Sequence, residues 1–208
     1  MMTTVFFELK NSQIGIAGLG GLGSNVAVAL VRTGAGRLIL ADFDVVEEPN
    51  LNRQQYFLDQ VGCHKVDALT ANLLRIRPDS DLVGRKVRLT PDNIPVIFAG
   101  CHVVAECFDR SDQKQMLVET VLSRMPDTAI VSVSGLAGYG RSNDIVTRRI
   151  HRRHVLVGDG TSGIGPGVPL TASRVGIAAH HQANAILELL LDTEMRSLWA
   201  RRNTGAGI

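Results

Sequence analysis

The chain has 208 residues, 45% of them hydrophobic, and a formal net charge of +2. This length and apolar content suit one domain with a full core, and the nearly balanced charge gives no case for a nucleic acid or a membrane surface as partner. Three cysteines without a Cys-x-x-Cys pair argue against a disulfide framework and against a cysteine zinc site. No apolar run reaches the roughly 18 residues of a membrane span, and the first residues lack the pattern of a signal peptide, so we expect a cytoplasmic protein.

A glycine-rich turn separates the first two expected elements. Residues 14–18 have the pattern of a buried strand and residues 21–33 that of a helix, and Gly18, Gly20 and Gly23 match the first, third and sixth positions of the dinucleotide-binding fingerprint. Glycine lets the backbone turn tightly and approach a ligand, and a helix amino terminus attracts an anion. The turn therefore predicts a phosphate site, although a ligand-free strand-to-helix turn would carry the same pattern.

Asp42 follows the second expected strand, residues 37–41. Its distance from the first glycine is close to the spacing of about 20 residues at which an acidic side chain binds a ribose hydroxyl in dinucleotide-binding folds. Asp44 lies nearby, so a pair of solvated carboxylates at a strand end is the alternative. Apolar strands that alternate with helices indicate a mainly parallel sheet covered on both faces, which is a doubly wound, Rossmann-like α/β fold.

A long polar segment, residues 45–60, comes next and contains Asn50, Arg53 and Gln54. Loops of this length inside a domain are more often functional than idle. The following helix opens around Lys65, in a first turn where the helix dipole disfavours a cation. We therefore expect an anion beside Lys65, with a lysine that simply reaches into solvent as the alternative.

Asp109 lies between an expected strand at 102–106 and an expected helix at 111–124. The carboxyl ends of the strands form the edge where open α/β folds bind ligands, so Asp109 is a candidate site residue. A helix cap worth about 1 kcal/mol is the alternative role. The other elements expected around it are a strand at 81–89, a short helix at 91–98 and a strand at 129–133.

The C-terminal part is less regular. We expect short antiparallel strands at 145–150 and 154–157, a glycine-rich loop at 158–167, a helix at 171–191 and a loose tail at 201–208. The basic cluster at 148–154 indicates a solvated strand face, with an acidic partner or nucleic acid as the alternative. His180 and His181 are expected to be ordinary helix residues, and His151 and His154 lack an identifiable third ligand for a metal.

The order of these elements resembles the ThiF/MoeB/HesA family, relatives of the ubiquitin-activating enzymes, and the chain looks closest to the short ThiF-like proteins of thiamine biosynthesis. The resemblance rests on the glycine turn at 18–24, the strand end at 42–46, the stretch 50–54, Lys65 and Asp109. It implies a single nucleotide-binding domain over residues 1–208, with a core at about 12–135 and C-terminal strands and a helix at 144–200.

In that family ATP adenylates the C-terminal glycine of a small ubiquitin-like sulfur carrier protein, and pyrophosphate is released. The resemblance thus implies an adenylyltransferase that uses ATP and Mg²⁺ on a carrier ending in Gly-Gly, as a homodimer, with neither nucleic acid nor membrane as partner. The catalytic residues it implies are Arg53, Lys65 and Asp109, of which Asp109 would bind the magnesium that accompanies ATP. The nucleotide-binding residues it implies are Gly18, Gly20, Gly21, Gly23, Asp42, Asp44, Asn50, Arg53, Gln54 and Lys65.

These residue types suit the implied chemistry. A carboxylate that attacks the α-phosphorus of ATP meets negative charge, so catalysis requires charge neutralisation and in-line positioning. Arg53 offers a planar fork for phosphate oxygens, Lys65 a mobile point charge and Asp109 an oxygen ligand for a hard metal ion.

The chain also departs from the family pattern. Many relatives hold zinc with two Cys-x-x-Cys pairs, and some use a cysteine after the sheet to take over the activated carrier, whereas no cysteine follows Cys107. Relatives send an arginine from an upstream helix into the neighbouring subunit's site, whereas residues 1–13 contain none. Adenylation is therefore implied more firmly than any later sulfur transfer.

Two other functions stay open. The glycine fingerprint and Asp42 equally permit an NAD- or FAD-dependent oxidoreductase, and the departures permit a non-catalytic module that binds nucleotide or carrier. The stretch 50–54 together with Lys65 favours adenylation, because hydride transfer needs no cationic clamp for a triphosphate.

Overall fold

The computed structural model describes residues 8–163, 165 and 167–204. Its strands are β1 (Gln13–Ala17), β2 (Arg37–Asp42), β3 (Leu82–Lys86), β4 (Val103–Glu106), β5 (Ala129–Val133), β6 (Val146–His151) and β7 (His154–Gly158). Its helices are α2 (Gly21–Thr33), α3 (Lys65–Ile76), α4 (Ile94–Ile97), α5 (Ser111–Arg124), α6 (Ala172–Leu191) and α7 (Thr193–Thr204), with 3-10 turns at Glu48–Asn50, Leu58–Gln60 and Ser142–Asp144. None of these helices combines the length and the apolar character that crossing a membrane requires.

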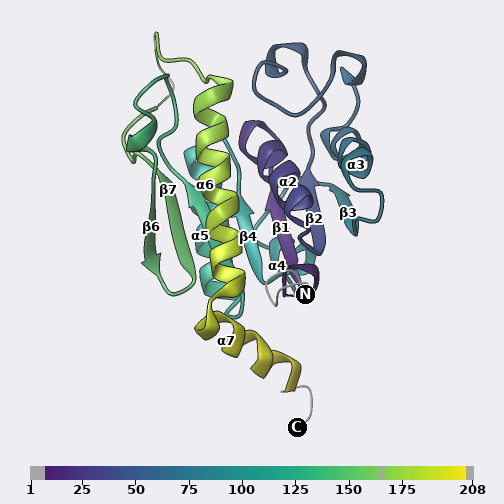
Figure 1. The fold of residues 1–208 in the computed structure, drawn as a ribbon, viewed down its shortest axis with the longest axis vertical. Helices are drawn as coiled ribbons and strands as arrows, with labels where there is room; N and C mark the ends of the chain where they lie inside the picture. The colour runs from purple at the N-terminus through teal and green to yellow at the C-terminus, as the bar shows by residue number, and fades with distance from the viewer. Residues whose placement is uncertain (1–7, 164, 166, 205–208) are drawn as a thin grey trace.

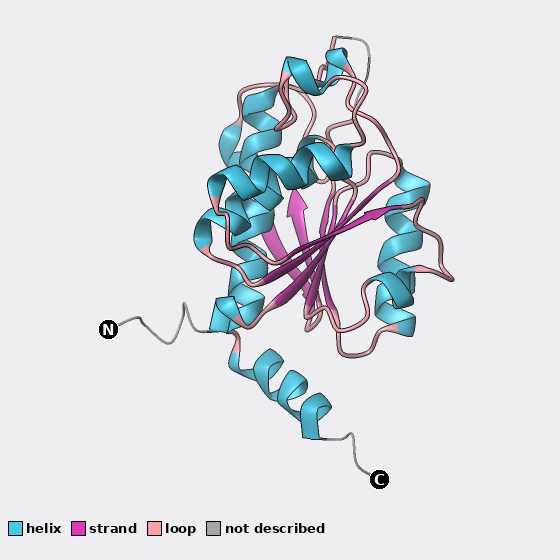
Figure 2. Ribbon diagram, turned by 90° about the vertical axis from the view of Figure 1, so that its right-hand side faces the viewer, coloured by secondary structure: helices cyan, strands magenta, loops and turns pink. Residues whose placement is uncertain are grey.

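One seven-stranded sheet has the order β3-β2-β1-β4-β5-β7-β6, and helices cover both of its faces (Figures 1 and 2). Neighbouring strands are parallel except β6 and β7, which are antiparallel. The fold is therefore the doubly wound, mainly parallel sheet that the sequence predicts, with its antiparallel extension near the C-terminal end. The strand order reverses between β1 and β4, the position at which such folds bind ligands.

Alternate side chains of the central strands enter two cores, one on each face of the sheet. Ile14 and Ile16 of β1 join the core formed with α2, α3 and α6, whereas Ala17 and Ile39 join the core formed with α4 and α5. Every residue of β5 is buried. Strands buried on both faces have no polar alternation, which is why they are continuous apolar runs in the sequence.

Helices α2 and α5 and strand β5 have the bounds that the sequence predicts, whereas β3 and α4 are shorter by several residues. The strand predicted at 81–89 ends at Lys86 because its partner strand β2 ends opposite it, at Asp42. The helix predicted at 91–98 is a single turn, since residues 90–93 form a separate turn before it. Both errors lie at element ends and leave the topology unchanged.

Helix α7 occupies a segment for which we predicted no helix. It continues to Thr204, so the predicted loose tail is wrong that far, and residues 205–208 lie outside the described part of the chain. Asp192 starts the helix, because its carboxylate accepts hydrogen bonds from two backbone N–H groups of the first turn. Met195 and Trp199, one turn apart, are buried. Two buried side chains are too few to give a readable helical period.

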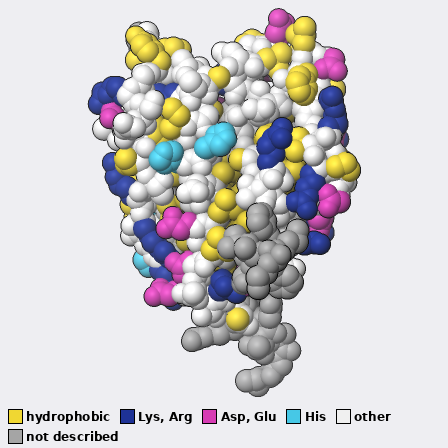
Figure 3. Space-filling view, in the orientation of Figure 1, with side chains coloured by type: hydrophobic (Ala, Val, Ile, Leu, Met, Phe, Trp, Pro, Cys, Tyr) yellow, Lys and Arg dark blue, Asp and Glu magenta, His cyan; other side chains and the backbone are white. Residues whose placement is uncertain are grey.

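The basic cluster at 148–154 is only partly the solvated face that we predicted. Strand β6 is mostly exposed, but Arg149 forms an ion pair with Asp192 at 2.7 Å, and Arg153 donates hydrogen bonds to backbone carbonyls at the end of α5. A cation at a helix C-terminus is favourable, so both arginines have structural roles. His180 and His181 lie on α6 as predicted. Figure 3 shows histidine side chains at the surface on the side of the molecule where α6 lies in Figure 1.

Candidate active site

A cleft of about 610 Å³ lies at the carboxyl ends of β1, β2, β4 and β5. The loops that follow β2 and β7 both lie at this upper end of the sheet (Figure 1). The structure brings almost all of the predicted site residues together here. Those that line the cleft are Gly18, Gly20, Gly21, Asp42, Asp44, Asn50, Arg53, Gln54, Lys65 and Asp109.

The glycines of the turn have two different tasks. Gly18 has φ 89°, and a Cβ on it would lie 2.9 Å from the carbonyl oxygen of Cys107. A Cβ on Gly23 would collide with the carbonyl oxygen of Gly18, and Gly23 is not part of the cleft lining. Gly20 is open, because a Cβ on it would meet only Gln54 Nε2, at 3.8 Å. Backbone packing requires a glycine at position 23, whereas Gly20 and Gly21 face the cleft, and the approach of Gly23 to a nucleotide stays a prediction.

Asp42 holds the turn through Leu19. Its Oδ2 accepts a hydrogen bond from Leu19 N at 2.6 Å, and its Oδ1 accepts one from Asp44 N at 2.8 Å. The buried hydroxyl of Tyr56 donates to Leu19 O at 2.7 Å, so both backbone groups of Leu19 are fixed. Burial, with Asp42 as the second cause, raises the pKa of Tyr56 far above its usual value, and the hydroxyl remains a donor. Tyr56 was not among the predicted site residues, although a lone tyrosine in a polar segment is a usable signal.

In the structure the anion beside Lys65 is a protein group, the carboxylate of Asp44. Lys65 Nζ lies 3.0 Å from Asp44 Oδ2, and the lysine side chain is only 8% exposed. The alternative of a lysine reaching into solvent is therefore wrong. Lys65 is the first residue of α3, and its backbone N–H also donates to Asp44 O at 3.0 Å. A phosphate entering the cleft would compete with Asp44 for the ammonium group.

Arg53 is held by neutral groups. Its Nη1 donates to Asn52 Oδ1 at 2.8 Å and its Nη2 to Asn50 Oδ1 at 3.1 Å. Within the described residues no carboxylate forms an ion pair with it. The adjacent Gln54 is 8% exposed, and its Oε1 is buried without a hydrogen-bonding partner. A positioned, uncompensated guanidinium beside an unsatisfied amide is an arrangement that a polar anionic ligand would complete.

Phe43 places an aromatic ring beside Asp42. The ring is 44% exposed, and the guanidinium carbon of Arg88 lies 3.7 Å from its centroid. Both side chains line the cleft. The two side chains hold each other through a cation–π contact and form one wall of the cleft.

Asp109 is exposed in the turn between β4 and α5. The N-cap residue of α5 is Arg110 and no side chain caps the helix, so the alternative role of Asp109 as a cap is wrong. The described residues contain no cluster of three His, Cys, Asp or Glu side chains that could hold a metal ion. A magnesium ion at Asp109 would thus take most of its oxygen ligands from a nucleotide and from water.

A buried ion pair lies directly beneath this turn. Glu106, with no exposed surface, accepts hydrogen bonds from Lys114 Nζ at 3.0 Å, from Phe108 N at 2.7 Å and from Val133 N at 3.3 Å. Lys114 also lines the cleft. Burial raises the pKa of Glu106, and Lys114 opposes the shift. This pair was not predicted, because Glu106 ends an apolar strand and Lys114 is one of several polar residues on the following helix.

Cys107 is not available as a nucleophile. The residue is 6% exposed, and its Sγ lies 3.5 Å from Gln182 Oε1. Burial, with Glu106 as the second cause, raises the pKa of this thiol far above its usual value. A neutral buried thiol reacts poorly. The cleft therefore has charged groups for binding and neutralisation, and Cys107, the cysteine among its lining residues, is buried and neutral.

The sheet order and the cleft at its carboxyl edge define a doubly wound α/β protein with its ligand site where such folds carry one. A family model described as the ThiF family matches residues 6–202, so the chain belongs to the ThiF family. This membership confirms the resemblance drawn from the sequence.

Curated relatives match parts of the chain. A tRNA threonylcarbamoyladenosine dehydratase of Bacillus subtilis is 36% identical over 131 residues, which are 62% of this chain and 51% of the relative. The adenylyltransferase and sulfurtransferase uba4 of Aspergillus clavatus is 35% identical over 136 residues, 64% of this chain and 27% of the relative. The chain thus spans about half or less of the length of these relatives.

Solved structures show the same fold. The E. coli tRNA N6-threonylcarbamoyladenosine dehydratase in complex with AMP has a TM-score of 0.82 and 20% identity, covering 91% of this chain and 90% of that chain. The same enzyme was also solved in complex with ATP, with a TM-score of 0.80. E. coli MccB has a TM-score of 0.68 and 23% identity, covering 89% of this chain and 58% of that chain.

Proposed function

We propose that the protein adenylates a carboxylate with ATP and releases pyrophosphate. The observation that carries this proposal is the set of charges in one cleft: the uncompensated guanidinium of Arg53, the fixed ammonium of Lys65 and the exposed carboxylate of Asp109. They surround a glycine turn at a helix N-terminus, which favours an anion. An NAD or FAD oxidoreductase requires no such set, so family membership and the cleft both favour adenylation over hydride transfer.

The reaction needs no protein nucleophile. A carboxylate oxygen of the acceptor forms a bond to the α-phosphorus of ATP, and the bond from that phosphorus to the bridging oxygen breaks, so that pyrophosphate leaves with the electron pair. Arg53 and Lys65 offset the charge on the phosphate oxygens, and the first turn of α2 presents backbone N–H groups to them. Asp42, fixed by Leu19 and facing the cleft, is the proposed ribose ligand.

Asp109 is the residue that we assign to magnesium. Its carboxylate is exposed at the cleft and is not needed to cap α5. One carboxylate, nucleotide phosphates and water are the oxygen ligands that Mg²⁺ usually takes. Bound there, the ion would supply charge neutralisation for the leaving pyrophosphate.

A small ubiquitin-like carrier ending in Gly-Gly is the acceptor that we favour. The resemblance of the sequence implies it, and the names of relatives such as uba4 and the ubiquitin-like modifier-activating enzyme 5 of Oryza sativa fit it. These names do not favour thiamine biosynthesis over the other pathways that use such carriers. We also propose that the protein is a homodimer, and sedimentation at several protein concentrations would measure its oligomeric state.

Exchange of labelled pyrophosphate into ATP tests the proposal. Purified protein with Mg²⁺ and a panel of Gly-Gly carriers should show exchange that depends on one carrier. The matched control is the same carrier with an amidated C-terminus, which lacks the attacking carboxylate. Absence of exchange with every carrier would contradict this acceptor.

A carboxylate on a modified tRNA is the second candidate acceptor. The observations that favour it are the 36% identity to a tRNA-modifying dehydratase and the TM-score of 0.82 to its E. coli counterpart. Activation of a carboxylate by ATP followed by attack of a neighbouring group removes water overall, which fits that name. Exchange that requires threonylcarbamoyl-modified tRNA and no carrier would decide for this candidate.

A further inference from the structure

The part of the cleft farthest from β2 in the strand order is formed by two loops. One follows β5 and contributes Ser134, Gly135 and Ala137, and the other follows β7 and contributes Ser162 and Gly163. We call residues 134–141 and 159–163 together the far wall. Its lining consists largely of backbone and small side chains, which suits an extended ligand with little side chain of its own.

The two loops of the far wall are hydrogen-bonded to each other at their bases. Asp159 N donates to Gly135 O and Gly160 N donates to Ser134 O, both at 3.0 Å. Gly135 has φ 80°, and a Cβ on it would collide with Asp159 Oδ1. The base of the wall is therefore one unit of close backbone contacts.

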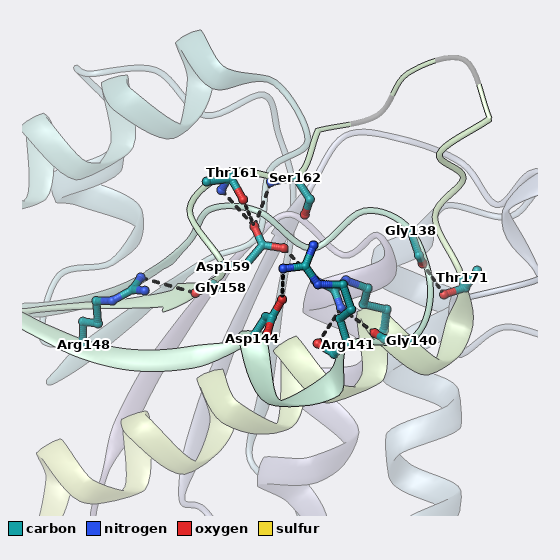
Figure 4. Close-up of polar contacts among 11 residues, drawn as sticks. Gly138, Gly140, Arg141, Asp144, Arg148, Gly158, Asp159, Thr161, Ser162 and Thr171 are labelled. Carbon is teal, nitrogen blue, oxygen red and sulfur yellow. Dashed lines mark hydrogen bonds and ion pairs between the residues drawn. The ribbon is translucent and has the colours of Figure 1, made fainter.

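Arg174, in the first turn of α6, joins the more distant parts of the same loops. Its Nη1 donates to Gly140 O at 2.6 Å and to Arg141 O at 2.9 Å, and its Nη2 donates to Asp159 Oδ2 at 2.6 Å. Figure 4 shows these acceptor residues, Gly140, Arg141 and Asp159, close together. Asp159 Oδ1 in turn accepts the backbone N–H groups of Thr161 and Ser162, each at 2.8 Å. One guanidinium thus fixes the loop after β5 to the loop after β7.

The geometry at Arg141 shows that this arrangement is imposed on the backbone. Arg141 has φ 47°, the only positive φ of a non-glycine residue in the described part of the chain. Its carbonyl is held by Arg174, and its side chain pairs with Asp144 at 2.6 Å. Such conformations persist only where the surrounding contacts determine them.

Stability alone does not account for a buried arginine at this place. The side chain of Arg174 is 4% exposed and that of Asp159 is 9% exposed. Replacing a buried ion pair by apolar side chains often leaves the stability of a protein unchanged or raises it. We therefore attribute to the Arg174–Asp159 pair the role of fixing the relative position of the two loops. A lysine could not reproduce these contacts, because they start from two nitrogens, Nη1 and Nη2, of one rigid planar fork, whereas an ammonium is a single point charge on a flexible stem.

We propose that Arg174 is a positioning residue for the acceptor, which keeps the two loops of the far wall at the separation that an extended, carboxylate-ended chain needs. This inference rests on the proposed adenylation and concerns the acceptor side of the same cleft. Arg174 itself is not among the residues that line the cleft. It acts through the loops, so its loss affects acceptor binding and leaves ATP binding intact.

The kinetic test compares Arg174→Lys with Arg149→Lys in pyrophosphate exchange. Arg149 pairs with Asp192 near the other end of α6, so it is a matched arginine away from the cleft. Arg174→Lys should raise the KM for the acceptor about tenfold or more and leave the KM for ATP within about twofold, because small misplacements near reacting groups have large effects. Arg149→Lys should change neither. An unchanged acceptor KM, or an equal rise in both KM values, would overturn the inference.

Hydrogen exchange on the full chain supplies a readout that needs no acceptor. In Arg174→Lys the amides of residues 135–141 and 159–163 should exchange faster, while those of residues 18–23 keep their protection. Unchanged protection of the far wall overturns the positioning role by itself. Absence of pyrophosphate exchange in the unmodified protein instead removes the proposed function, and the acceptor role with it, so the two failures are distinguishable.

Discussion

Lys65 Nζ and Asp44 Oδ2 form an ion pair of 3.0 Å inside the cleft. The lysine side chain is 8% exposed and the aspartate side chain 47%, so water reaches the anion far more easily than the cation. The pair keeps the ammonium in position at the start of α3. A nucleotide phosphate would take the place of Asp44 as the partner of this ammonium.

Loss of this ammonium should weaken nucleotide binding. We expect Lys65→Met to raise the Kd of a non-hydrolysable ATP analogue about 10- to 100-fold, the equivalent of one charged hydrogen bond. Lys86→Met is the matched control, because Lys86, on the edge strand β3, forms an ion pair with Asp67 of α3 and is not among the residues that line the cleft. Calorimetric titration measures both. Equal affinities for the two variants would remove Lys65 from the phosphate site.

Asp109→Ala should abolish magnesium-dependent pyrophosphate exchange. Because Asp109 is exposed and caps no helix, we expect the Tm of the variant to stay near that of the unmodified protein. Asp112→Ala serves as the control, since Asp112 pairs with Arg110 at the surface of α5. Exchange retained in Asp109→Ala would show that another group binds the metal.

Tyr56→Phe should lower the free energy of unfolding by about 1–2 kcal/mol, because it leaves the buried Leu19 carbonyl without its donor. Tyr139, which is 75% exposed, provides the control Tyr139→Phe, expected to stay within about 0.5 kcal/mol. Urea denaturation measures both variants. A loss in Tyr56→Phe no larger than in the control would mean that this hydrogen bond does not stabilise the glycine turn.

The acid dependence of stability should change when Asp159 is replaced. Burial opposes its ionisation, but the N–H groups of Ser162 and Thr161 and the guanidinium of Arg174 hold the pKa of Asp159 well below its usual range. The unfolded chain therefore takes up this proton first as the pH falls. The stabilisation is present above the ordinary aspartate pKa of about 3.9 and decreases below it.

Urea titrations at several pH values follow this effect. From about pH 5 to about pH 3 the free energy of unfolding should fall more steeply for the unmodified protein than for Asp159→Asn. Parallel curves for the two proteins would show that the carboxylate is not stabilised in the folded state.

Short-range features of the fold and the site could be predicted from the sequence. The glycine turn is local, because the packing of Gly23 on Gly18 lies within one strand-to-helix connection. Asp42 and Asp109 could be found because strand ends in a parallel sheet meet at one edge. The position of these residues in the cleft was therefore predictable from the order of elements alone.

Pairings between distant residues could not be predicted in the same way. Nothing in the sequence tells that Lys114 reaches back to Glu106, or that Arg174 is buried against Asp159, because a charged residue on a helix is usually solvated. The helical pattern of α6 is the same whether Arg174 points outward or inward. These interactions depend on how the loops meet in space, and only the structure supplies that.

The most direct measurement of the central claim is the intact mass of the acceptor after incubation with the protein, ATP and Mg²⁺. Adenylation predicts an acceptor that carries one AMP, with pyrophosphate released in equal amount, and neither product in Asp109→Ala. Formation of ADP and phosphate, or neither an AMP adduct nor release of AMP together with pyrophosphate for any carrier or tRNA acceptor, would contradict it.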